Sequence, residues 1–276
     1  MNIPVFAIIG ARNEARDIEN VLRQLGRAGI QGAVVVCNGG TDDTLARTLA
    51  FNAQSPFPVA TVFFHAALGH DVARAVGTYA LLRRVSAACK SAYCLYLDAD
   101  LSGSFGPMLA DFIAFGTAED RDVTSLSSSC LRDEGMAGAA AIWREALHHQ
   151  KAVPESAVPF MVPLLVHTRL FRRVSPLLLA NPGCWVAVVA RLETASWCTY
   201  DAWDNRLVGH RSRSPAHARA MRERIALDGR TVYSILGHRQ LPRTSVAPCA
   251  PLPSRNLEAL ERYAAAATWI IPPRGD

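Results

Sequence analysis

Two acidic residues, Asp98 and Asp100, stand one residue apart directly after the apolar run Tyr93–Leu97. Two carboxylates at the end of a buried strand are costly unless a positive charge compensates them. Carboxylate oxygens suit Mg²⁺ or Mn²⁺, and these ions complete their coordination with water and phosphate oxygens. The pattern therefore predicts a metal site for a phosphate-bearing ligand. A helix cap beside a solvated loop is the alternative interpretation of such a pair.

The first hundred residues alternate apolar runs of strand length with segments of helical periodicity. The runs are Val5–Ile9, Ala33–Cys37, Val59–Phe64 and Tyr93–Leu97. Strand–helix units of this length predict an α/β fold, a mostly parallel sheet flanked by helices. Ligands bind at the carboxyl ends of the strands in such sheets. The polar segments 10–14, 38–43 and 98–100 would therefore meet at one edge of the sheet.

Four motifs in this region resemble those of nucleotide-sugar glycosyltransferases of the GT-A fold, which is Rossmann-like. They are AIIGARNE at 7–14, NGGTDDT at 38–44, GHDVARAVG at 69–77 and LDADL at 97–101. Their order and spacing agree with the family over residues 3–101. Gly10 stands where the family usually has Pro, and His70 and Asp71 replace a Lys and a Gly. The resemblance implies a GT-A fold and a nucleotide-diphosphate sugar, linked to UDP or GDP, as donor.

The resemblance also implies a role for each matched residue. The residues of the first two strand ends that would contact the donor are Gly10, Ala11, Arg12, Glu14 and Asn38. His70, Arg74 and Arg211 would lie near its diphosphate. Asp98 and Asp100, with Ala99 between them, would hold Mn²⁺ or Mg²⁺. A cation that bridges the diphosphate oxygens stabilises the charge that develops on this leaving group.

Residues 207–213, LVGHRSR, resemble a segment of glucosyl-3-phosphoglycerate synthases and related retaining enzymes in which a His completes the metal site. His210 would be that ligand here, and His238 is the substitute. A neutral imidazole binds Mn²⁺ beside carboxylates. The acceptor loop of those enzymes, G-R-V-T-E, would fall near residues 154–158 and is absent, which disfavours 3-phosphoglycerate as the acceptor.

A second acidic cluster, at Asp201 and Asp204, lies where inverting relatives place a carboxylate base. A base accepts the proton of the acceptor hydroxyl. Asp204 is the first choice for this role and Asp201 the second. In a retaining enzyme the same residue would bind acceptor hydroxyls, so the stereochemical outcome stays open.

The composition, with 50% hydrophobic and 19% charged residues, excludes a mainly disordered chain. The formal net charge is +5, and all but two of the 29 basic residues are Arg. Nine of them lie between residues 205 and 243, against two acidic residues. Because Arg makes forked contacts to phosphate and carboxylate, a small polar or anionic acceptor is expected.

We expect a single GT-A domain with two functional halves. Residues 1–101 would bind the nucleotide sugar and residues 102–243 the acceptor, and 244–276 would form a tail with a dimer contact. In the second half the helices predicted are 107–115, 136–150, 215–227 and 257–267, with a strand over 185–189. No membrane span or signal peptide is visible. Seven scattered cysteines without a CxxC motif predict a cytoplasmic protein with reduced thiols.

Three alternatives to a metal-dependent glycosyltransferase with a small acceptor remain. Asp98–Ser102 also resembles the D-A-D-L-S segment of dolichyl-phosphate mannose synthases, and the apolar, Arg-studded stretch 162–179 suits contact with a membrane surface. A nucleotidyltransferase would need a Gly-rich loop after Ile9, and none follows. A non-catalytic anion- or nucleic-acid-binding protein would use the Arg-rich segment, but no nucleic-acid-binding motif supports that partner.

Overall fold

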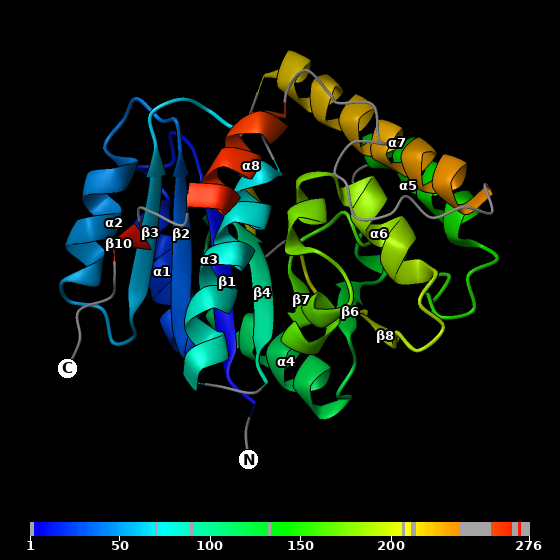
Figure 1. Ribbon diagram of the computed structural model, residues 1–276, viewed down its shortest axis with the longest axis horizontal. Coiled ribbons are helices and arrows are strands. Elements are labelled where there is room, and N and C mark those ends of the chain that lie inside the picture. The colour runs from blue at the N-terminus through cyan, green and yellow to red at the C-terminus, as the bar shows by residue number, and fades with distance from the viewer. Residues whose placement is uncertain are drawn as a thin grey trace.

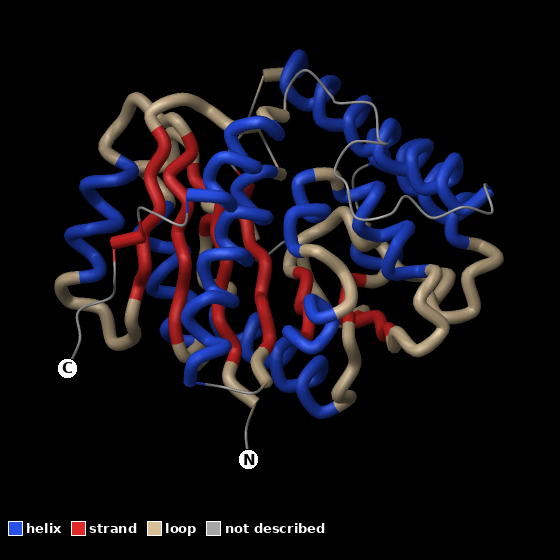
Figure 2. The backbone as a smooth tube through the Cα atoms, in the orientation of Figure 1, coloured by secondary structure: helices blue, strands red, loops and turns tan. Residues whose placement is uncertain are grey.

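A mixed β-sheet with helices on both faces forms the centre of the protein (Figure 1; Figure 2). The computed structural model describes residues 3–69, 71–88, 91–131, 134–205, 208–210, 214–237, 255–266 and 270–271. The strands of this sheet are β1 (Val5–Ala11), β2 (Gly32–Asn38), β3 (Val59–Phe64), β4 (Tyr93–Asp98), β6 (Val123–Leu126), β7 (Leu164–His167), β8 (Trp197–Tyr200) and β10 (Ile270–Ile271). A separate pair consists of β5 (Leu101–Ser102) and β9 (Gly209–His210). The helices are α1 (Ile18–Arg27), α2 (Thr44–Asn52), α3 (Val72–Ala88), α4 (Gly106–Ala118), α5 (Glu134–Leu147), α6 (Pro182–Ala190), α7 (Pro215–Gly237) and α8 (Leu257–Ala266).

The strand order in the described residues is β10-β3-β2-β1-β4-β7-β6-β8. Strands β1 to β4 run parallel, as the strand–helix alternation predicts. Strand β7 is antiparallel to both β4 and β6, so the sheet becomes mixed in the second half of the chain. The α/β fold class is confirmed, and one continuous sheet joins the two expected halves.

Both faces of the parallel strands are buried, which explains their almost uninterrupted apolar sequences. Ile8 and Tyr96 face one core, which they share with α3, α6 and α8. Ile9 and Leu95, on the opposite face, pack in a second core with α1 and α4. The first strands are thus held from both sides, and their carboxyl ends form a rigid edge.

The strand predicted at residues 185–189 is wrong, because these residues belong to α6. Pro182 stands in the first turn, where a missing N–H costs nothing, and the Asn181 side chain accepts a hydrogen bond from the Cys184 N–H at 3.3 Å. The helix is apolar around most of its circumference because it is almost entirely buried. A short apolar run of this kind has no periodicity that separates strand from buried helix. The other expected helices are confirmed, and α7 extends ten residues beyond its predicted end at 227.

The stretch 162–179, for which a membrane contact is one alternative, is partly buried in the core. All of β7 is buried, and so are Leu170, Val174 and Leu179. Arg169 donates hydrogen bonds to Asp120 at 2.9 Å and Asp122 at 2.7 Å. Arg172 and Arg173 are exposed, and a membrane contact through this stretch stays a prediction. No helix in the described parts of the chain combines the length and apolar character that crossing a membrane requires.

The expectation of reduced thiols holds for the described cysteines Cys37, Cys94, Cys130 and Cys198. It is wrong for Cys184, which is disulfide-bonded. The sequence spacing carries no signal for this bond, because the seven cysteines are scattered and none belongs to a CxxC motif.

The described parts of residues 244–276 fold back onto the same chain. The Tyr79 hydroxyl on α3 donates a hydrogen bond to the Ala264 carbonyl of α8 at 2.9 Å, and β10 pairs with the edge strand β3. The dimer contact expected for this region stays a prediction.

A partly buried ion pair between Asp122 and Arg169 connects β6 to the residues after β7. At the start of β6, Asp122 accepts hydrogen bonds from Arg169 Nε at 2.7 Å and from the Ser196 N–H at 2.9 Å. Burial raises the pKa of Asp122, but the Arg169 and Ser196 bonds outweigh it, so the pKa is lowered overall. We predict that Asp122→Asn lowers the free energy of unfolding by about 1–3 kcal/mol at pH 7.

The pH dependence of this loss follows from the direction of the shift. Because the pKa of Asp122 is lower in the folded state, its charged carboxylate stabilises the fold. This stabilisation is fully present above the unfolded pKa of about 3.9 and is lost as the pH falls through the folded pKa. Urea titrations should therefore show a difference between the wild type and Asp122→Asn that shrinks below about pH 4. The control is Asp120→Asn, because Asp120 is 60% exposed and binds the same Arg169. It should cost less than about 1 kcal/mol. Equal losses in the two variants would contradict the prediction.

Candidate functional site

The carboxyl ends of β1, β2 and β4 meet at one edge of the sheet, as the sequence predicts. Gly10 lies opposite Asp98 of β4 on one side and Val36 of β2 on the other. In Figure 1 this is the upper edge, toward which the arrowheads of β2 and β3 point. The three polar segments therefore leave the sheet side by side.

Hydrogen bonds fix the loops after β1 and β2 to each other. Asn13, in the left-handed region at φ 60°, accepts a hydrogen bond from the Thr41 N–H at 2.7 Å through its Oδ1. Asp42 accepts one from the Ala15 N–H at 3.0 Å, and the Glu14 N–H donates to Thr44 Oγ1 at 2.8 Å. These contacts give Asn13 and Asp42 a structural role at the base of the first two motifs.

Asn38, expected to contact the donor, holds the loop between β3 and α3. Its Oδ1 accepts a hydrogen bond from the Leu68 N–H at 2.7 Å, and its Nδ2 donates to the Gly69 carbonyl at 2.8 Å. Gly39 follows at φ 68°, and a Cβ there would lie 2.2 Å from the Ala67 nitrogen. Only Gly fits this close approach. The structure thus shows Asn38 as a positioning residue, and a contact with a nucleoside stays a prediction.

Arg74, on the first turn of α3, lies against the acidic motif at the end of β4. Its guanidinium is 3.4 Å from Asp98 Oδ1 and 3.8 Å from Asp71 Oδ1. Burial lowers the pKa of Arg74, but the charges of Asp98 and Asp71 outweigh that effect and raise it. Gly10 permits this arrangement, because a Cβ at Gly10 would lie only 2.9 Å from the Ala73 Cβ.

A buried arginine continues this network toward the C-terminal half. The Arg255 guanidinium lies 2.8 Å from Asp71 Oδ2 and 2.9 Å from Asp228 Oδ2, and its side chain is 2% exposed. Burial raises the pKa of Asp228 even though Arg255 opposes this. Arg255 thereby links the start of α3 to the middle of α7. Arg255 and Asp228 are not predicted from the sequence. The signal available was Asp71, because an acidic residue that replaces the family's Gly needs a positive partner.

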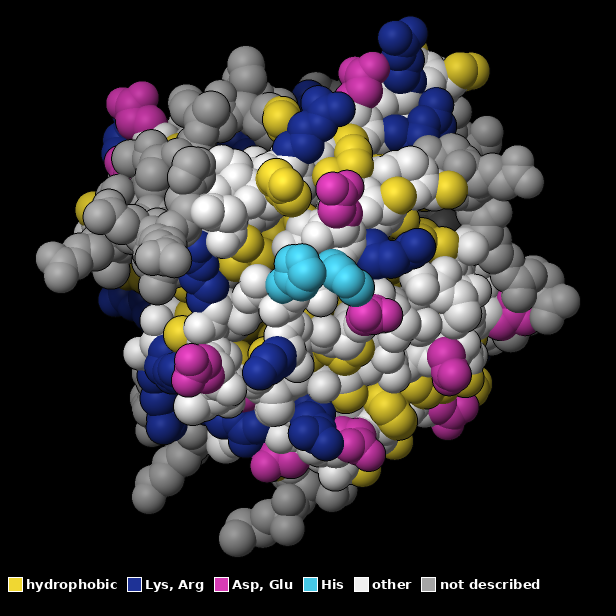
Figure 3. Space-filling view, turned by 90° about the vertical axis from the view of Figure 1, so that its right-hand side faces the viewer, with side chains coloured by type: hydrophobic (Ala, Val, Ile, Leu, Met, Phe, Trp, Pro, Cys, Tyr) yellow, Lys and Arg dark blue, Asp and Glu magenta, His cyan; other side chains and the backbone are white. Residues whose placement is uncertain are grey.

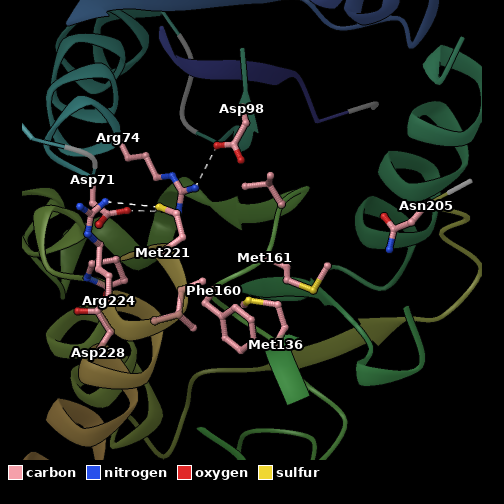
Figure 4. Close-up of a pocket in the computed structure, with 13 residues that line it drawn as sticks. Asp71, Arg74, Asp98, Met136, Phe160, Met161, Asn205, Met221, Arg224 and Asp228 are labelled. Carbon is pink, nitrogen blue, oxygen red and sulfur yellow. Dashed lines mark hydrogen bonds and ion pairs between the residues drawn. The ribbon is translucent and has the colours of Figure 1, made fainter. Parts of the chain in front are cut away.

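A pocket of about 170 Å³ lies beside these charges (Figure 4). Its charged and polar residues include Arg74, Asp98 and, from α7, Arg224. Its apolar residues come from the second half of the chain. The full lining is Asp71, Arg74, Asp98, Met136, Phe160, Met161, Val162, Pro182, Asn205, Met221, Arg224, Ile225 and Asp228. The pocket therefore has a charged side and an apolar side.

The expected metal ligands are placed in part. Asp98 is 39% exposed in its side chain and lines the pocket, and Asp100 is buried in the turn that follows β4. Strand β9 pairs with β5, which sets the backbone of His210 opposite Leu101, one residue from Asp100. The described side chains form no group of three His, Cys, Asp or Glu residues able to hold an ion. His70, Arg211, His238 and the His210 side chain lie outside the described residues.

Two carboxylates with a His position beside them are a donor set that suits Mn²⁺ or Mg²⁺. The residues present therefore fit the implied ion, and its binding belongs to the proposal below.

The acidic residues expected to act as a base do not line the pocket. Asp201 is exposed just after β8, and the Asp204 N–H donates to Met108 Sδ at 3.1 Å. The next residue, Asn205, lines the pocket instead, and its Oδ1 accepts a hydrogen bond from Trp203 Nε1 at 3.0 Å. The roles of Asp201 and Asp204 stay predictions.

The described part of the Arg-rich segment does not form a one-sided basic surface. Arg219 pairs with Glu223 at 3.0 Å, and Arg224 faces the pocket. On the face drawn in Figure 3, basic and acidic side chains are interspersed. The described side chains on this face show no patch of a single charge sign of the kind that binds nucleic acid.

Comparison with known proteins shows the fold. No protein-family model and no curated protein matches the sequence. Among solved structures, glucosyl-3-phosphoglycerate synthase from Mycobacterium tuberculosis, solved with phosphoglyceric acid, aligns with a TM-score of 0.54 and 15% identity, over 84% of this chain and 80% of that one. Mannosyl-3-phosphoglycerate synthase from Rubrobacter xylanophilus aligns with a TM-score of 0.56 and 13% identity, over 83% of this chain and 73% of that one. The chain therefore shares its fold with these two synthases, which confirms the GT-A fold expected from the motifs.

The role of Asn38 can be tested on the protein without ligands. We predict that Asn38→Ala lowers the free energy of unfolding by about 1–3 kcal/mol, because it removes two hydrogen bonds from a buried site. Hydrogen exchange should show faster exchange of the Leu68 amide. Asn52→Ala is the matched control, since Asn52 Oδ1 accepts a bond from the Val59 N–H at the other end of β3. It should leave Leu68 protected, and unchanged Leu68 exchange in Asn38→Ala would show that Asn38 does not hold this loop.

Proposed function

We propose that the protein is a metal-dependent glycosyltransferase that moves a sugar from a UDP- or GDP-linked donor to the hydroxyl group of a small acceptor. One observation carries the proposal: Asp98 and Arg74 meet at the strand edge, and both line the same pocket. A carboxylate for an ion and a guanidinium for a diphosphate are the groups that this donor needs. The fold shared with two sugar-phosphoglycerate synthases supports the same reaction class.

The donor would lie along the sheet edge. Gly10, Ala11, Arg12 and Glu14, with the loop held by Asn38, would surround the nucleoside. Arg74 would face the diphosphate, together with His70 and Arg211. Asp98, Asp100 and His210 would hold Mn²⁺ or Mg²⁺, which supplies positive charge to the leaving diphosphate when it is bound.

Side chains of the protein would stabilise the charge of the leaving diphosphate and accept the proton of the acceptor hydroxyl. In the transfer, the acceptor oxygen bonds to the anomeric carbon, and the bond from that carbon to the diphosphate oxygen breaks. The nucleoside diphosphate leaves with the electron pair, and Arg74 stabilises its charge. The hydroxyl proton passes to a carboxylate, for which Asp204 is the first choice and Asp201 the second.

Removing either carboxylate of the acidic motif tests the metal role. We predict that Asp98→Asn and Asp100→Asn abolish the Mn²⁺-dependent thermal stabilisation by UDP or GDP and abolish sugar transfer. A ligand at a hundred times its Kd stabilises the native state by about 2.7 kcal/mol, which a thermal shift detects easily. Asp111→Asn, on the exposed face of α4, is the control and should behave like the wild type. Full activity in Asp100→Asn would overturn the mechanism.

Arg74 gives a second test of the donor site. We predict that Arg74→Gln weakens nucleoside diphosphate binding by about 10-fold or more, because a charged hydrogen bond to phosphate is lost. Isothermal titration with UDP and GDP, each with Mn²⁺, measures the change. Arg219→Gln, an exposed substitution on α7, controls for the loss of one positive charge. Equal binding by the two variants would place the diphosphate away from Arg74.

A further inference from the structure

The two sides of the pocket come from different parts of the chain. Asp71, Arg74 and Asp98 belong to the first hundred residues, where the donor is expected. The apolar side is built by α5, the loop before β7, and α6 and α7. Its members are Met136, Phe160, Met161, Val162, Pro182, Met221 and Ile225. A molecule that lies between this apolar side and Asp98 therefore contacts hydrocarbon and thioether groups (Figure 4).

The charges around the pocket compensate one another. Arg74 pairs with Asp98 and Asp71, and Arg255 pairs with Asp71 and Asp228. Two guanidinium groups, of Arg74 and Arg224, and three carboxylates line the pocket, and the buried Arg255, which is outside the lining, pairs with two of these carboxylates. Among the described side chains an anionic acceptor would meet as much negative as positive charge, and a cation at Asp98 would be balanced by the donor diphosphate, so these walls give it no net attraction. The described residues therefore favour a neutral acceptor.

Thioether side chains dominate the apolar side. Three of the chain's five methionines, Met136, Met161 and Met221, line the pocket. Methionine sulfur is polarisable, adapts its shape and makes favourable contacts with aromatic rings. The Arg224 Nη1 lies 3.7 Å from Met221 Sδ and holds that side chain on the wall. Such a surface suits a ring or a short hydrocarbon group.

The size of the pocket limits the group it takes. An engineered apolar cavity of about 150 Å³ binds benzene. At about 170 Å³ the pocket has room for one group of this size, and not for a nucleotide sugar as well. The donor must then lie along the strand edge, as proposed above, with its reacting end at Asp98.

We infer that the acceptor is a neutral alcohol or phenol whose apolar part, about the size of a benzene ring, binds against the methionine-lined side of the pocket. This inference rests on the proposed transfer and replaces the expectation of a polar or anionic acceptor. The hydroxyl end faces Asp98 and the donor, and the apolar end faces Met136, Met161 and Met221.

The first experiment measures binding and transfer separately on the full chain. Ligand-observed NMR tests benzyl alcohol and glycerol without a donor. Nucleoside diphosphate release is then measured with Mn²⁺ and UDP- or GDP-hexoses, using benzyl alcohol, phenol, glycerol, glycerate and 3-phosphoglycerate as acceptors. We expect benzyl alcohol to bind where glycerol does not. Release should be at least about 10-fold faster with benzyl alcohol or phenol than with glycerol, the factor that about 1.4 kcal/mol of apolar binding gives.

Variants on α7 connect this preference to the pocket. Met221→Gln keeps the side-chain length but adds a polar amide, so it should raise KM for benzyl alcohol by about 10-fold and leave the nucleotide thermal shift unchanged. Met221→Leu should retain most of the wild-type KM. The control is Leu227→Gln on the same helix, because Leu227 is 39% exposed and does not line the pocket.

The outcomes separate the two proposals. Transfer to glycerate or 3-phosphoglycerate but not to benzyl alcohol or phenol would overturn the acceptor inference and leave the glycosyltransferase proposal standing. An unchanged KM in Met221→Gln would also overturn it. No metal-dependent binding of any nucleotide would overturn the proposed function and the acceptor inference together.

Discussion

The charge network that runs from Asp98 through Arg74 and Asp71 to Arg255 and Asp228 is the constraint on which the site depends. Each of these charges would be expensive to bury alone, and the removal of one partner from a buried pair costs about 3–5 kcal/mol. Asp71 forms ion pairs with both Arg74 and Arg255, so it connects the two arginines. The network therefore fixes α3, the end of β4 and the middle of α7 relative to one another. Those are the elements that border the pocket.

The sheet supplies the second requirement, which is a rigid edge. Parallel strands place every carboxyl end on the same side, so motifs some thirty residues apart in sequence converge. The loops after these strands are then tied to one another by side chains that look like ligand-binding residues in the sequence. Asn38 is an example, because both ends of its amide bind the loop before α3. A motif residue can thus support a site by shaping a loop instead of touching the ligand.

The parts predicted from the sequence are those whose signals are local. The four parallel strands are predicted from uninterrupted apolar runs, and the meeting of the three polar segments at one edge follows from their parallel order, whereas the register that pairs Gly10 with Asp98 does not. The helix α6 was not predicted as a helix, since a fully buried helix and a buried strand have the same composition. Arg255 could not be predicted, because its partners Asp71 and Asp228 are distant in sequence and no motif surrounds it. The methionines that line the pocket could not be predicted either, because they form one surface only when α5, α7 and the loop before β7 pack together.

The Arg content shows why a count of charges does not predict the potential at a site. Nine Arg between residues 205 and 243 suggest an anionic ligand when they are read along the chain. In the fold, Arg219 is neutralised by Glu223 at the surface, and Arg224 enters a pocket that already contains Asp71, Asp98 and Asp228. Electrostatic attraction depends on the charges within a few ångströms and on their exposure to screening solvent. What distinguishes this side of the pocket among the described residues is therefore its thioether and hydrocarbon surface, and under the proposed transfer selectivity for the acceptor would follow from apolar contact instead of net charge.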